Sequence, residues 1–220
     1  MKFITAFILI CLTACTTTEK ETNQPPKTNY SGFLSDYSQL KKVDVGDDSD
    51  LLRFFDRKIK EHGYENIMLD PVTFYPAPKA SETISNKALT NIGAYFNNTV
   101  LNVAKESGKL VETAGAKTMR VKMAITSIDV TDSKLSAYQY VPIAFLVTAA
   151  SGGLSEMDVK FQIETELTDS LTGEVLGAAI KQGFGEKLDD SEQALTLDNV
   201  KPLIDNWATT MKSTLTEILK

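Results

Sequence analysis

The sequence is poor in the side chains that carry most catalytic and metal-binding chemistry. Its 220 residues include one histidine, His62, and two cysteines, Cys11 and Cys15. A serine hydrolase needs a histidine-type base beside its nucleophile, and a structural zinc site needs four cysteine or histidine ligands. His62 precedes Gly63 in a predicted loop, so we interpret it as a surface residue. The shortage excludes a structural zinc site, and no catalytic, cofactor-binding or metal-binding motif is found.

Positive charge is scarce as well. The sequence has 23 lysines and arginines against 29 aspartates and glutamates, which gives a net charge of −6. An acidic protein lacks the basic surface that neutralises phosphate groups, so we expect no nucleic-acid partner. For the same reason, we do not expect electrostatic adhesion to anionic lipid.

Apolar runs long enough to span a bilayer are also missing, because a transmembrane helix needs about 20 such residues. A shorter apolar run, residues 3–12, follows the positive charge of Lys2 and precedes small residues. This order is typical of a secretory signal peptide. The residues that close it, Leu12-Thr13-Ala14-Cys15, resemble the lipobox of bacterial lipoproteins. The alternative is an ordinary signal peptide that happens to contain a cysteine.

The lipobox resemblance implies a processed and lipid-modified protein. Residues 1–14 are removed, and Cys15 receives a diacylglycerol thioether and an acyl group such as palmitate on its new amino group. Two or three acyl chains hold a protein on a membrane almost permanently. Cys11 leaves with the signal peptide, so no free thiol remains. By resemblance to lipoprotein sorting, Thr16 in place of aspartate implies the outer membrane, with the protein facing the periplasm.

The mature chain divides into a tether and one domain. Residues 16–29 contain no aliphatic or aromatic side chain. Nothing there drives burial, so we predict that residues 15–30 are the lipidated cysteine and a disordered tether. The length of residues 31–220 fits a single globular domain.

Hydrophobic periodicity predicts the elements of this domain. A helix begins at Thr83 and stops at Gly108, and the chain ends in a second long helix. Residues 51–59 are either a helix or a strand. The predicted strands cover residues 66–75, 119–130, 157–167 and 174–182. The second of these changes phase at Thr126-Ser127, which indicates a bulge.

This order predicts an α+β fold. It has a mainly antiparallel sheet of about four or five strands, with two long helices packed on one face and a more polar opposite face. Glu164 and Glu166 fall on that polar face, where we interpret them as solvated. In the acidic cluster of residues 44–50, the alternating carboxylates that a calcium loop needs stop after Asp48 and Asp50, so the cluster is interpreted as a solvated loop. Gly183-Phe184-Gly185 is a broken phosphate-binding fingerprint.

Three stretches of the domain resemble a known family. They are residues 30–40, Ile67-Met68-Leu69-Asp70-Pro71-Val72, and residues 167–176. Together they are similar to a family of Gram-negative outer-membrane lipoproteins that is catalogued only as a domain of unknown function. The resemblance spans most of residues 31–219. It implies a location and a fold, and it supplies no catalytic residues.

Residues 138–153 form one unusual apolar stretch between two predicted strands. The stretch is either buried in the core or an exposed patch for self-association, a partner or the membrane surface. The patch residues are Tyr140, Val141, Ile143, Phe145, Leu146 and Val147.

The sequence as a whole favours a non-catalytic, lipid-anchored envelope protein that interacts with, or assists the assembly of, another envelope protein. The alternative is an envelope enzyme or small-molecule binder with a carboxylate-lined cleft. Neither reading implies a cofactor.

Overall fold

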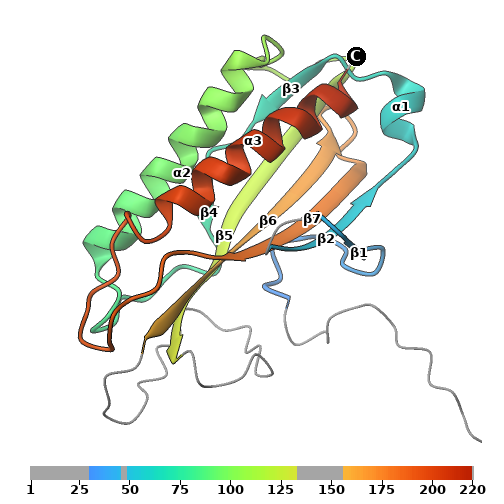
Figure 1. Ribbon diagram of the computed structural model, residues 1–220. Coiled ribbons are helices and arrows are strands. Elements are labelled where there is room, and N and C mark those ends of the chain that lie inside the picture. Colours follow the sequence, from blue (N-terminus) through green and yellow to red (C-terminus); the bar gives the residue numbers. More distant parts are fainter. Residues whose placement is uncertain (1–29, 46–48, 133–155, 220) are drawn as a thin grey trace, which may run out of the picture.

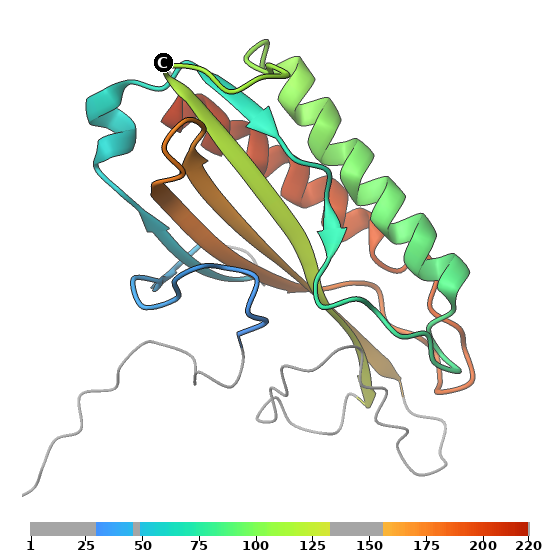
Figure 2. The ribbon, with the colours of Figure 1, turned by 180° about the vertical axis from the view of Figure 1, so that it is seen from behind.

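The computed structural model describes residues 30–45, 49–132 and 156–219. In this part of the chain, one seven-stranded sheet has the order β1-β2-β7-β6-β5-β3, and β4 also pairs with β5. The helices are α1 (Lys58–His62), α2 (Asn86–Glu106) and α3 (Lys201–Ile218). The strands are β1 (Lys41–Val43), β2 (Asp50–Phe55), β3 (Asn66–Leu69), β4 (Thr73–Phe74), β5 (Thr118–Asp132), β6 (Met157–Asp169) and β7 (Val175–Phe184). Helices α2 and α3 lie side by side on one face of the sheet (Figure 1). The opposite face is seen in Figure 2, where the blue segment of residues 30–40 lies against it.

Helix α2 shows how local sequence sets an element. The Ser85 side chain caps the helix by accepting a hydrogen bond of 3.1 Å from the backbone amide of Ala88. Gly108 has a φ of +67°, the left-handed conformation that favours glycine just beyond a helix. Apolar residues between these ends face the sheet, and Ile92 and Phe96 are fully buried. None of the helices in the described ranges is long and apolar enough to cross a membrane.

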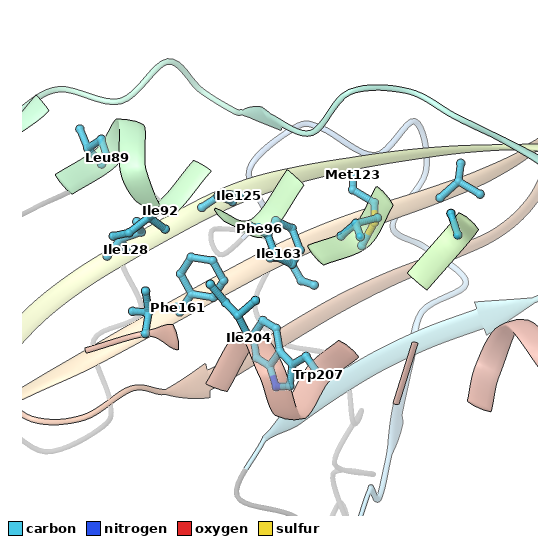
Figure 3. Packing of buried hydrophobic residues seen from close by; sticks show 14 of the residues in the cluster. Leu89, Ile92, Phe96, Met123, Ile125, Ile128, Phe161, Ile163, Ile204 and Trp207 are labelled. Carbon is cyan, nitrogen blue, oxygen red and sulfur yellow. The ribbon is translucent and has the colours of Figure 1, made fainter. Parts of the chain in front are cut away.

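Strands β5, β6 and β7 form the centre of the sheet. The register of β5 against β6 shifts between Ile125 and Ser127, so the predicted bulge is confirmed. Strands β6 and β7 form the predicted hairpin, with Gly173 at a φ of +74° in its turn. Alternate residues of β6 face the helices, where Phe161 lies 6.0 Å from Phe96 and 5.6 Å from Trp207 between ring centroids (Figure 3). This aromatic group is the centre of the core.

The predicted fold class is wrong. The sheet has seven strands and is mixed, because β3 and β4 run parallel to β5. Helix α2 makes the crossover that parallel strands require. There are also three helices in the described chain, of which α2 is the longest with 21 residues.

The strands that the sequence did not predict come from stretches whose hydrophobic pattern was weak. The single strand predicted at residues 66–75 is two short strands, β3 and β4, separated at Pro71. Residues 51–59 were predicted to be either a helix or a strand, and they contain part of each. Strand β2 ends at Phe55, and helix α1 begins at Lys58. Strand β1 has only three residues.

Candidate functional site

The face of the sheet away from the helices holds two buried carboxylates. Glu164 on β6 is 0% exposed and Glu166, two residues later, is 5% exposed. The expectation that both are solvated is therefore wrong. The reason is that residues 30–40 cover this face, with Leu34 and Leu40 packed against Ala178 and Ile180 of β7.

Both carboxylates accept hydrogen bonds from the covering segment, and a lysine of the sheet lies beside Glu166. Tyr37 Oη donates to Glu164 Oε2 at 2.7 Å, and the Ser31 amide donates to Glu164 Oε1 at 3.3 Å. The amide and hydroxyl of Ser35 both donate to Glu166 Oε2, the amide at 2.8 Å. Lys122 Nζ lies 3.6 Å from Glu166 Oε1. Each of the four carboxylate oxygens thus has a polar partner.

Burial sets the electrostatics of this pair. It raises the pKa of Glu164, and the hydrogen bonds from Tyr37 and Ser31 act in the opposite direction. Burial also raises the pKa of Tyr37 to about 12, and the neighbouring Glu164 adds to the shift. Tyr37 therefore stays protonated and donates its hydrogen bond throughout the physiological range of pH.

The arrangement fastens the covering segment to the sheet. A buried carboxylate is stable only when hydrogen bonds replace its lost hydration, and these glutamates obtain those bonds from residues 31, 35 and 37. A catalytic pair would instead direct its oxygens into a cleft that admits substrate. The carboxylate-lined cleft of the alternative hypothesis is not formed by Glu164 and Glu166.

A groove lies on the other face, between the sheet and the helices. Its volume is about 180 Å³, and β2, β7, β6 and β5 form its floor. The carboxyl-terminal half of α3 and part of α2 form its other side, including Trp207 and Met211. Most of the lining side chains are apolar. The charged ones among the described residues are Arg53 and Lys181.

The remaining sequence candidates lie apart from these two sites. His62 ends α1 beside Gly63, and its ring lies 6.0 Å from the ring of Tyr64. The described ranges contain no group of three or more histidines, cysteines, aspartates or glutamates that could hold a metal ion. Cys15, the six patch residues from Tyr140 to Val147, and residues 46–48 of the acidic cluster lie outside the described residues.

Sequence reasoning missed the donors Ser31, Ser35 and Tyr37. A signal was present in the neighbouring strand, where Ala178 and Ile180 lie opposite Glu166 and Glu164. Apolar residues on a face expected to be solvated indicate that something covers it.

In the described residues, the fold and these sites define a mixed seven-stranded sheet with two helices on one face and the segment of residues 30–40 closing the other. The chain belongs to the family described as protein of unknown function (DUF3313), whose profile matches residues 29–211. It is 32% identical over 203 residues to the uncharacterized lipoprotein YdcL of Escherichia coli strain K12, covering 91% of this chain and 89% of that protein. The resemblance to bacterial lipoproteins of unknown function is therefore confirmed.

Solved structures of similar proteins are more distant. A PelC dodecamer from Paraburkholderia phytofirmans matches with a TM-score of 0.34 and 10% identity, over 77% of this chain and 96% of that one. A neuraminyllactose-binding hemagglutinin homolog from Helicobacter pylori matches with a TM-score of 0.36 and 6% identity, over 72% of this chain and 86% of that one.

Proposed function

We propose that this protein is a lipid-anchored, non-catalytic protein of the outer membrane that faces the periplasm and assists or binds another envelope protein. Cys15 carries the lipid after residues 1–14 are removed, and residues 15–30 link it to the domain. The lipobox and membership of a family with a lipoprotein relative support the anchor. Attachment through two or three acyl chains needs no basic surface, which suits a net charge of −6.

The observation that carries the proposal is how residues 30–40 meet the domain. This segment follows directly after the proposed tether, and Glu164 and Glu166 bind it on a central strand of the sheet. The most buried carboxylates of the described chain thus hold the anchored end in place. That is the arrangement expected of a domain whose tether must leave it at a fixed point, on the sheet face away from the helices.

The contact surface that we propose is the apolar stretch carried between β5 and β6. The ends of these two strands extend beyond both helices (Figure 1). The chain between them contains Tyr140, Val141, Ile143, Phe145, Leu146 and Val147. In the described chain, which excludes this stretch, the exposed large apolar side chains are only Tyr75, Leu171 and Phe184. A partner or a second copy would therefore bind at residues 140–147.

The test combines an anchor variant with a patch variant in intact cells. Cys15→Ala should shift the protein from the membrane fraction and remove the lipid mass. Phe145→Asp with Leu146→Asp should remove partners captured by crosslinking and identified by mass spectrometry. The matched control is Leu171→Asp with Phe184→Asp, which changes an exposed leucine and phenylalanine elsewhere. Unchanged partners and association state in the folded patch variant would contradict the proposal.

A further inference from the structure

The groove between the sheet and the helices exists because small side chains lie where large ones would fill it. Arg53 of β2, Ala179 of β7, Thr165 of β6 and Met123 of β5 are consecutive partners across four strands, and all line the groove. Ala179 and Thr165 stand in the middle of this row and are only half-buried, although they lie on the helix side of the sheet. The helices thus leave an open floor at this row.

The lining indicates a hydrocarbon ligand. Trp207, Met211 and Leu215 of α3 form one wall, and Val100 and Val103 of α2 belong to the other. A dry apolar cavity of about 150 Å³ in another protein holds one benzene molecule. The volume of about 180 Å³ therefore accommodates about seven carbons of one chain, with the rest of the ligand at the open side.

The charge of the lining indicates an anionic head group. Arg53 and Lys181 are the basic residues of the lining, and no aspartate or glutamate is among the described residues that line the groove. This differs from the protein as a whole, whose net charge is −6. Arg53 is half-buried, with its guanidinium carbon 4.8 Å from the centroid of the Phe55 ring. A guanidinium so placed can bind a carboxylate through two hydrogen bonds.

We propose that this groove binds the hydrocarbon end of a single-chain fatty acid, with the carboxylate at Arg53. The volume fits one chain and not the two chains of a phospholipid. The protein's own acyl anchor is a poorer occupant, because the chain enters the domain at Tyr30, on the opposite face of the sheet. The proposal goes beyond the function proposed above and does not depend on lipidation of Cys15.

Photocrosslinking tests the proposal on the full chain in isolated cell envelopes. The probes are a ten-carbon fatty acid with a diazirine near its methyl end, and the alcohol and the amine of the same chain. After irradiation, mass spectrometry maps the labelled peptides. We expect the acid to label β6, β7 and α3 at the groove at least about tenfold more than the amine, because about 1.4 kcal/mol of charge discrimination gives a factor of ten.

Variants of the lining separate the groove from other sites. Two substitutions place a large side chain in the groove: Ala179→Phe fills it from the floor, and Thr210→Trp fills it from α3. Each should lower this labelling about tenfold. The control Thr209→Trp, on the exposed side of α3, should leave the labelling unchanged. Arg53→Glu should lower labelling by the acid and spare the alcohol, whereas Arg57→Glu, at an exposed arginine, should change neither. Melting temperatures show which variants are folded. If only one of the two variants Ala179→Phe and Thr210→Trp is folded, that variant is enough for the test.

Four results would overturn the proposal. The first is equal labelling by the acid and the amine, and the second is labelling that persists in a folded variant whose groove is filled by Ala179→Phe or Thr210→Trp. The third, in envelopes whose lipids carry the diazirine, is a crosslinked mass that belongs to a phospholipid. The fourth is a crosslink to the acyl group of Cys15. Because Cys15→Ala is labelled in parallel in whole-cell lysate, where it is present even without an anchor, failure of the proposed anchor is distinguished from failure of the groove.

Discussion

The phenol of Tyr37 donates a hydrogen bond of 2.7 Å to Glu164, a residue 127 positions further along the chain. The same oxygen accepts hydrogen bonds from the backbone amides of Gly32 and Leu34, at 2.9 and 3.2 Å. One hydroxyl group therefore shapes residues 30–40 and joins them to the sheet. Removal of the Tyr37 hydroxyl should therefore affect both the shape of residues 30–40 and their attachment to the sheet.

Tyr37→Phe should lower the free energy of unfolding by about 1–3 kcal/mol, because a buried carboxylate loses its donor and two amides lose their acceptor. Denaturant unfolding monitored by circular dichroism measures the loss. Tyr75→Phe is the matched control, since Tyr75 is 42% exposed and should change the free energy by no more than about 0.5 kcal/mol. Equal effects of the two substitutions would show that the Tyr37 hydroxyl has no special role.

Glu164→Gln should change how stability depends on pH. Burial raises the pKa of Glu164 above its ordinary value of 4.5, so the folded state holds this proton more tightly than the unfolded state. The contribution of Glu164 is fully present below 4.5 and is lost as the pH rises toward the folded-state pKa. Relative to wild type, the Gln variant should therefore gain stability across that window. Unfolding free energies at a series of pH values test this, and a constant difference would contradict it.

Asp169→Asn should show the opposite slope. The amide of Thr172, with further hydrogen bonds from Tyr64 and Leu171, holds the pKa of Asp169 below its ordinary value of 3.8. Its contribution is therefore present above 3.8 and is lost as the pH falls through the folded-state pKa. The destabilisation caused by Asn should be full at neutral pH and should shrink in acid. The same unfolding series measures it, and a difference that grows in acid would refute the assignment.

Gly185→Ala should destabilise the domain by about 1–3 kcal/mol or more, as expected for overpacking against backbone. A Cβ at this position would lie 2.3 Å from the carbonyl oxygen of Asn199. Gly115→Ala is the control, because its Cβ would meet nothing closer than Thr118 Oγ1 at 3.5 Å. Thermal unfolding compares the two variants. A harmless Gly185→Ala would show that the loop at Asn199 can move away.

The sequence predicted the elements whose side chains repeat with a clear period. Helix α2 has its apolar stripe and its stop at Gly108 as predicted, although it begins at Asn86 and not at Thr83, and apolar and polar residues alternate in β6 from Met157 to Glu164. The bulge near Ser127 and the turn at Gly173 are local features and were also predictable. Strand β2 was ambiguous because both of its faces are covered, so that Leu51, Leu52, Phe54 and Phe55 do not alternate with polar residues.

The candidate sites depended on contacts that periodicity does not encode. Glu164 alternates with apolar neighbours as a solvated residue would, and only the position of residues 30–40 makes it buried. The groove arises from the pairing of Ala179 with Thr165 and with Arg53 across three strands. Such pairings require the strand order, which the periodicity of the sequence does not predict.

The fastening of residues 30–40 also has a mechanical consequence. Ser31 is bound at Glu164 and Ser35 at Glu166, so the segment is attached at two successive points of β6. A force applied at Tyr30 would load the bond between Ser31 and Glu164 before the bond between Ser35 and Glu166, and both before strand β1. The sheet would thus be shielded from tension by contacts that can break and re-form.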